Sequence, residues 1–254
     1  MIRALGPLGL VGCLTQLPEV DDPCAAFDDP GMYRFDVETE ERTRKPFVYV
    51  PPGAGPRDLL VLLHGGGSSA PDVQEVTGYT AAADEQGFVL VVPNGLGFPL
   101  RTWNAGDGPD VDADDVGFLD TLVSDLRPRV CGDRTLGVGF SNGGMMAHRW
   151  ACEGNQADAI SSVAGPLLVD ACEGPPRPVL HWHGTADKVV PVDGGRSAGV
   201  DFPPVTDTMD TWRVRNQCAP EPRDAVTEGD TTCTVYDCAA STELCLVENW
   251  PHRW

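Results

Sequence analysis

Short apolar runs alternate with longer amphipathic segments through most of the chain. Residues Leu59–Leu63 and 88–92 are continuous apolar runs, as in strands that are buried on both faces of a parallel sheet. Segments 32–38 and 45–50 alternate with a period of two and predict a pair of strands joined by a charged turn. The same reasoning predicts further strands over 134–138, 159–163, 178–182 and 243–247.

Helices are expected between these strands. The pattern predicts them over 72–86, 115–129, 142–152 and 205–216. Gly87 follows the first of these segments and suits a helix C-cap, because glycine adopts a left-handed conformation at little cost. Strands that alternate with helices are typical of an α/β fold with a doubly wound, mostly parallel sheet. The 254 residues show no repeat or low-complexity tract, which fits a single domain.

The pentapeptide 139–143, Gly-Phe-Ser-Asn-Gly, stands between a predicted strand and a predicted helix. A G-x-S-x-G motif in this setting is typical of a nucleophile elbow, a sharp turn that exposes a serine hydroxyl at the edge of the sheet. The alternative is a glycine-rich turn that carries an ordinary serine. The motif makes Ser141 the candidate nucleophile of an α/β-hydrolase fold.

A serine hydroxyl becomes nucleophilic when a base takes its proton and a third group orients that base. On this fold the partners follow the serine in the order acid, then histidine. Asp187 lies just past the predicted strand 178–182, at the edge where functional loops gather. His252 is the histidine that follows it, so Asp187 and His252 complete the predicted triad. Asp193 is the second choice of acid, and an ordinary turn residue is the alternative role for Asp187.

A second glycine-rich segment, His-Gly-Gly-Gly at 64–67, follows the buried strand Leu59–Leu63. Its backbone N–H groups could point toward a developing negative charge, as an oxyanion hole requires. The sequence predicts one donor from the backbone of Asn142 and the other from Gly66 or Gly67. We expect His64 to brace this loop rather than to transfer protons.

The charge balance excludes one class of partner. The formal net charge is −20, and nucleic-acid binding depends on Lys and Arg side chains that neutralise phosphates. An acidic run at 110–115 resembles the start of a calcium loop, but it lacks the glycine and the closing glutamate of that motif. Asp114 or Asp115 is better explained as a helix N-cap, and no metal site is predicted.

The N-terminal segment predicts export. One basic residue and a short apolar stretch precede Leu-Val-Gly-Cys at 10–13, which resembles a bacterial lipobox. The sequence therefore predicts an export signal over 1–13, lipidation of Cys13 and membrane attachment through it, with a catalytic domain over 14–254. The alternatives are a buried N-terminal strand or a misassigned start. The eight other cysteines predict up to four disulfides in an oxidising compartment.

Several segments together resemble the extracellular polyhydroxybutyrate depolymerase and feruloyl esterase type of α/β-hydrolases. They are Leu-Leu-His-Gly-Gly-Gly at 62–67, Trp-Asn at 103–104, Asp-Val-Gly-Phe-Leu at 115–119, Gly-Phe-Ser-Asn-Gly-Gly-Met at 139–145, His-Gly-Thr-Ala-Asp at 183–187 and His-Arg-Trp at 252–254. The resemblance implies a carboxylesterase without metal or organic cofactor. It also implies that Trp103 forms a substrate-pocket wall, with plain packing as the alternative, and His64 is counted with it at the substrate site.

The chain departs from that family pattern near the predicted base. Asn-Trp-Pro at 249–251 replaces a glycine-rich stretch, and the sequence ends two residues after His252. His252 on its short tail is therefore the weakest link of the predicted triad.

The expected function is an exported serine carboxylesterase that acts on polyhydroxyalkanoate esters or on feruloyl or acetyl esters of polysaccharides. Two alternatives belong to other classes. A peptidase on the same fold would need a recognition site for a chain terminus, and a non-catalytic binding protein would be marked by loss of Ser141, Asp187 or His252, all of which are present. The sequence leaves the oligomeric state open.

Overall fold

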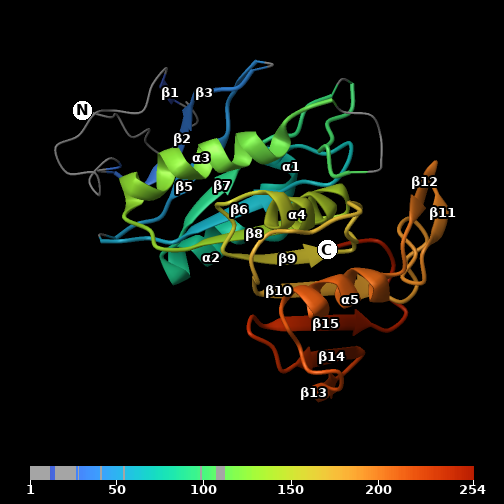
Figure 1. The fold of residues 1–254 in the computed structure, drawn as a ribbon. Helices are drawn as coiled ribbons and strands as arrows, with labels where there is room; N and C mark the ends of the chain where they lie inside the picture. The colour runs from blue at the N-terminus through green and yellow to red at the C-terminus, as the bar shows by residue number, and fades with distance from the viewer. Residues whose placement is uncertain are drawn as a thin grey trace.

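A twisted sheet with helices on both faces forms the centre of the molecule (Figure 1). The computed structural model describes residues 12–14, 27, 29–40, 42–53, 55–97, 99–106 and 112–254. In these ranges the sheet has 11 strands. Their order across the sheet is β1 (Gly12–Leu14), β2 (Gly31–Phe35), β5 (Phe47–Val50), β7 (Val89–Val92), β6 (Leu59–Leu63), β8 (Thr135–Phe140), β9 (Ala159–Val163), β10 (Val179–Gly184), β15 (Thr242–Val247), β14 (Thr231–Tyr236) and β13 (Pro222–Glu228).

The middle of the sheet is parallel. Each neighbouring pair from β7 through β6, β8, β9 and β10 to β15 runs in the same direction. Antiparallel strands flank this core, with β5 against β7 on one side and β14 and β13 beyond β15 on the other. The predicted doubly wound, mostly parallel α/β-hydrolase sheet is therefore confirmed.

Five helices of the described chain cover the two faces of the sheet. Side chains alternate along β6, so that Leu60 and Leu62 pack with Val73 of α1 (Ala70–Thr77) and Ala83 of α2 (Tyr79–Gln86). The other side chains of β6 join the larger cluster on the opposite face. That cluster includes α3 (Asp115–Val130), α4 (Asn142–Glu153) and Trp212 of α5 (Val205–Arg215). The continuous apolar run of β6 thus serves two hydrophobic cores at once.

Two features differ from the sequence expectations. The single helix predicted over 72–86 is divided into α1 and α2, because Gly78 takes a left-handed φ of 67°. The predicted C-cap at Gly87 is confirmed, since its φ is 79° and its N–H donates to the carbonyl of Ala83. Several short strands had no signal in the sequence. They are β4 (Thr43–Arg44), β11 (Gly195–Ser197), β12 (Val200–Phe202), β13 and β14, while the strand predicted over 32–38 is divided into β2 and β3 (Val37–Glu38).

Disulfides concentrate in the second half of the described chain. The pairs are Cys152–Cys172, Cys218–Cys238 and Cys233–Cys245. The last joins two directly opposed residues of β14 and β15. Cys131 is disulfide-bonded as well.

Most of the predicted export segment, residues 1–11, lies outside the described residues. The backbone of Gly12–Leu14 forms β1 and pairs in parallel with β2. Lipidation of Cys13 stays a prediction. In the part of the chain that is described, no helix has the length and apolar character needed to cross a membrane.

Candidate active site

Ser141 stands on a sharp turn between β8 and α4. Its φ of 53° and ψ of −123° lie where non-glycine residues are rarely found, so the turn holds a strained backbone at this position. The flanking glycines permit the turn. A Cβ atom on Gly139 would lie 2.1 Å from the carbonyl oxygen of Gly143, and one on Gly143 would lie 2.3 Å from that of Leu63. The motif therefore folds as the tight elbow that its sequence predicts.

The structure brings Ser141, His252 and Asp187 together in one hydrogen-bonded row. His252 Nε2 lies 3.0 Å from Ser141 Oγ, and His252 Nδ1 lies 2.6 Å from Asp187 Oδ2. In the chain, His252 is 111 positions from Ser141 and 65 positions from Asp187. The geometry allows the imidazole to accept the serine proton on one side while the carboxylate orients it from the other.

Asp187 is held by its own turn at the end of β10. The residue is 5 % exposed, and its Oδ1 accepts hydrogen bonds from the backbone N–H groups of Val189 at 2.8 Å and Val190 at 2.9 Å. Its second oxygen, Oδ2, is left to face His252. Asp193 is exposed and makes no hydrogen bond or ion pair with His252 among the described residues, so the geometry favours Asp187 as the acid.

Packing contacts hold the C-terminal tail that carries His252. The carbonyl of Trp250 accepts a hydrogen bond from the N–H of Ala186, in the same turn as Asp187. The ring of Phe140, next to the serine, lies 4.8 Å from the His252 ring and 5.5 Å from the Trp254 ring, measured between centroids. The tail that the sequence marked as the weakest link is thus anchored to both the elbow and the acid turn.

The glycine loop after β6 lies against the elbow. A Cβ atom on Gly66 would meet that of Asn142 at 3.7 Å, so the two residues are neighbours. The N–H of Gly67 already donates to the carbonyl of Arg101 at 2.7 Å, whereas that of Gly66 has no hydrogen-bond acceptor among the described residues. Of the two glycines left open by the sequence, Gly66 is therefore the better second donor beside the backbone of Asn142.

His64 and Trp103 support this glycine loop through hydrogen bonds. The Gly95 N–H donates to His64 Nε2 at 3.0 Å, so the ring proton is on Nδ1, which donates to the carbonyl of Gly65 at 2.8 Å. Burial lowers the pKa of His64 to about 4, which keeps the ring neutral. Trp103 is 1 % exposed and donates from Nε1 to the His64 carbonyl. Its burial favours the packing alternative over a substrate-facing wall, and His64 braces the loop as expected.

The side chain of Asn142 has a structural role that the sequence did not reveal. Its Oδ1 accepts hydrogen bonds from the Trp103 N–H at 2.7 Å and from Thr102 Oγ1 at 2.9 Å, and its Nδ2 donates to the Trp103 carbonyl. The residue after the nucleophile therefore ties the elbow to the loop at 102–103. No local pattern announces this contact, because the partners are about 40 positions apart.

A buried ion pair between Arg44 and Asp115 supports the same loop. The Arg44 side chain also donates to the carbonyl of Asn94, and Asp115 Oδ2 accepts the Asn104 N–H at 2.8 Å. Asp115 thus joins the buried network, while Asp114 acts as the N-cap of α3 by accepting the Gly117 N–H. The sequence had left the cap between these two aspartates.

One cluster of the described residues has metal-ligand spacing, namely Cys233, Glu243 and Cys245. The two cysteines form a disulfide with each other, so they offer no thiolate to a metal. The cluster is therefore a structural cross-link.

Curated relatives of this chain are esterases by name. A putative esterase, NocK, from Nocardia uniformis is 37 % identical over 185 residues, covering 67 % of this chain and 53 % of that protein. Feruloyl esterase B from Piromyces equi is 30 % identical over 214 residues, covering 76 % of this chain and 39 % of that protein. The chain thus spans about half, or less, of the length of these relatives. No protein-family model matches the chain.

The fold also matches solved structures. An acetyl xylan esterase from Aspergillus awamori superposes with a TM-score of 0.64 at 13 % identity, covering 82 % of this chain and 89 % of that one. An identity this low carries the fold alone. Together with the sequence relatives, it confirms the predicted resemblance to α/β-hydrolases of the feruloyl esterase type.

Proposed function

Since this chain is an α/β-hydrolase related to the feruloyl esterases, we propose that it is a serine carboxylesterase with Ser141 as nucleophile, His252 as base and Asp187 as acid. The observation that carries the proposal is the hydrogen-bonded row from Ser141 Oγ through the His252 ring to Asp187 Oδ2. This arrangement is the one that acyl transfer through a serine requires.

In the proposed mechanism His252 Nε2 takes the Ser141 proton while Oγ attacks the ester carbonyl carbon. Asp187 Oδ2 accepts the Nδ1–H of His252, which fixes the tautomer and stabilises the imidazolium that forms. The tetrahedral intermediate collapses when its C–O bond breaks and His252 protonates the departing alcohol. Water then attacks the acyl-enzyme with the same base, releasing the acid and restoring Ser141.

The backbone N–H groups of Asn142 and Gly66 are the proposed oxyanion donors. Both lie beside the nucleophile, and the N–H of Gly66 is not engaged within the described residues. Donors that are fixed in advance stabilise the charge of the transition state without reorganising, and losing one costs about 10²–10³ in rate.

We propose feruloyl or acetyl esters of polysaccharides as the leading substrates, with polyhydroxyalkanoate esters as the second class. The names of the relatives support the first class, because they include feruloyl esterases and a bifunctional acetylxylan esterase/xylanase from Neocallimastix patriciarum.

The disulfides support a proposed location in an oxidising compartment outside the cytoplasm. Lipidation of Cys13 belongs to the same proposal. Labelled palmitate should enter the wild-type chain in a bacterial host but not a Cys13→Ser variant. Equal labelling of both chains would exclude Cys13 as the anchor.

The function is tested by hydrolysis of p-nitrophenyl acetate, methyl ferulate and a soluble hydroxybutyrate oligomer. Ser141→Ala should lose about 10⁴-fold or more in kcat, because triad members act as a unit. Ser124→Ala, which changes an exposed serine of α3, is the matched control and should retain full activity. Activity that survives in Ser141→Ala would remove the proposed nucleophile, and an inactive wild type would favour a binding protein.

A further inference from the structure

Three buried histidines form a second hydrogen-bonded row behind the proposed triad. His148 lies on α4, and His181 and His183 lie on one face of β10. His148 Nε2 is 3.2 Å from His181 Nδ1, and His181 Nε2 is 3.1 Å from His183 Nδ1. The proposed mechanism uses none of them, although buried imidazoles are costly to accommodate without a defined set of partners.

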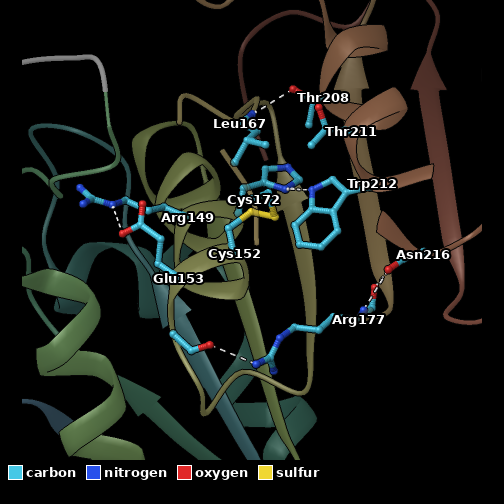
Figure 2. The surroundings of a disulfide bond; sticks show 12 residues. Arg149, Cys152, Glu153, Leu167, Cys172, Arg177, Thr208, Thr211, Trp212 and Asn216 are labelled. Carbon is cyan, nitrogen blue, oxygen red and sulfur yellow. Dashed lines mark hydrogen bonds and ion pairs between the residues drawn. A yellow bond between two sulfur atoms is a disulfide. The ribbon is translucent and has the colours of Figure 1, made fainter. Parts of the chain in front are cut away.

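The two ends of the row determine where every proton lies. At one end Trp212 Nε1–H donates to His148 Nδ1 at 2.9 Å, from the position beside the Cys152–Cys172 disulfide that Figure 2 shows. At the other end His183 Nε2 lies 2.8 Å from the carbonyl of Val190. An indole N–H can only donate and a carbonyl can only accept. One arrangement satisfies both ends: all three rings are neutral and carry their proton on Nε2.

We propose that this histidine row, His148, His181 and His183, is a positioning device for the acid turn. Val190 is the link, because its carbonyl accepts from His183 while its N–H donates to Asp187 Oδ1. The row joins α5, α4 and β10, so it connects the helix that begins just after Ser141 to the turn that holds Asp187. Its role as a catalytic support rests on the function proposed above.

The direction of the His183 proton also leaves Asp187 Oδ2 available to accept a hydrogen bond from His252. His183 Nε2 is 3.6 Å from that oxygen, but its proton is directed to Val190, so the short contact of Oδ2 is with His252 at 2.6 Å. A charged His183 would carry protons on both ring nitrogens. It would compete with His252 for the carboxylate, and its Nδ1–H would oppose the N–H of His181.

The surroundings keep the rings neutral. Burial lowers the pKa of all three histidines. For His148 burial is the sole cause, and it lowers the pKa to about 3. The charged groups that act on His183 are Asp187, which favours its protonation, and His252, which opposes it. His181 is affected by the two other histidines of the row, both of which oppose its protonation. Burial outweighs the attraction of the one carboxylate.

The first test reads the tautomers directly and needs no substrate. Long-range ¹H–¹⁵N correlation spectra of ¹⁵N-histidine-labelled wild type should show His148, His181 and His183 as Nε2–H tautomers. His64 is the internal control, because its partners require the opposite tautomer. An Nδ1–H or charged state for any ring of the row near pH 7 would overturn the proposal, whether or not the chain is an esterase.

The second test asks whether the row acts as a unit. Trp212→Phe removes the donor at one end, and it should shift the imidazole ¹⁵N signals of all three histidines. Trp150→Phe is the matched control, because it removes another buried indole donor, to Asp120, and should leave those signals in place. A change confined to His148 in Trp212→Phe would show separate contacts and overturn the proposal.

The third test measures the effect on the reaction. His183→Leu cannot bind the Val190 carbonyl, so kcat should fall about tenfold or more with KM unchanged, as for a displaced catalytic group. His183→Gln can still donate there and should recover part of the loss. A folded His183→Leu variant with wild-type kcat, or an effect confined to KM, would show a merely structural role. An inactive wild type would count against the proposed function, while the tautomers still decide the arrangement of the row.

Discussion

At the scale of single residues, glycines are needed for the geometry of the proposed site. Gly139 and Gly143 allow the elbow to form, and Gly184 does the same for the C-terminal tail. A Cβ atom on Gly184 would lie 2.1 Å from the carbonyl oxygen of Trp250, which is a backbone atom and cannot rotate away. The position of His252 therefore depends on the absence of a methyl group on the neighbouring strand.

We expect Gly184→Ala to displace the tail while leaving the sheet intact. A displacement of about 1 Å at a reacting group can cost about 100-fold, so kcat should fall by one to two orders of magnitude. Steady-state kinetics with p-nitrophenyl acetate, alongside a thermal melt, check this expectation. Gly199→Ala, which strains an exposed hairpin turn at a φ of 86°, is the control. Unchanged kcat in Gly184→Ala would mean that the tail tolerates the shift.

At the scale of elements, disulfides fasten less buried segments to one another or to the packed core. Figure 2 shows Cys152, at the end of α4, joined to Cys172 in the segment after β9, with Trp212 of α5 alongside. The other pairs brace the region after α5 and the β14–β15 ribbon. β13 is exposed along its whole length, so this edge of the sheet buries little apolar surface. Covalent links compensate for that deficit.

Replacing both Cys152 and Cys172 by alanine should lower the free energy of unfolding by about 3 kcal/mol, as closure of a loop of about 20 residues predicts. Urea denaturation of the oxidised proteins measures the difference. The hydrogen bonds of the proposed triad do not involve these cysteines, so kcat should change less than twofold. A large fall in kcat without loss of stability would show that this link acts on the site.

At the scale of the whole molecule, burial of histidines makes stability depend on pH. His64, His148, His181 and His183 are buried, and burial lowers the pKa of each, to about 4 for His64 and about 3 for His148. In the unfolded chain the usual value is about 6.5. Below that pH the unfolded state binds more protons than the folded state, so acid favours unfolding.

For each of these histidines, the free energy of unfolding should fall by up to about 1.4 kcal/mol per pH unit below about 6.5. Above that pH their burial should cause no change. We expect the midpoint of thermal unfolding to fall between pH 6.5 and pH 5. Repeating the melts in high salt separates this effect from repulsion within a chain of net charge −20, because salt screens surface charges far more than buried ones. A midpoint that stays level across this range would contradict the assignment of neutral, buried rings.

Elements with a strong local hydrophobic pattern could be predicted from the sequence, and exposed elements could not. Leu59–Leu63 was predicted with its observed bounds, because a strand buried on both faces has a continuous apolar pattern. The bounds of 159–163 were also predicted, although burial alternates along this strand and two of its residues are serines. β13 was missed because all its residues are exposed and leave no hydrophobic period. Motifs and chain order led to Ser141, Asp187 and His252, which the structure brings into contact.

The contacts that support the proposed triad, namely the Arg44–Asp115 pair and the histidine row, could not be predicted from the sequence. The Arg44–Asp115 pair joins residues 71 positions apart, one on β4 and the other at the start of α3, so no local pattern encodes it. His181 and His183 share a face of β10 by simple alternation, which the sequence does show. Their meeting with His148 depends on the placement of α4 against β10, which no local spacing encodes.

The long separations within the proposed site also have a consequence for the order of folding. His252 reaches Ser141 only after β15, the last strand in sequence, has docked in parallel beside β10. Contacts between distant parts of a chain form slowly, because the entropy of closing the intervening loop is lost before they form. During refolding, recovered activity would therefore report a late event, later than the fluorescence change of the buried Trp150 on α4. If the proposed activity is present, its recovery would indicate that β15 is in place.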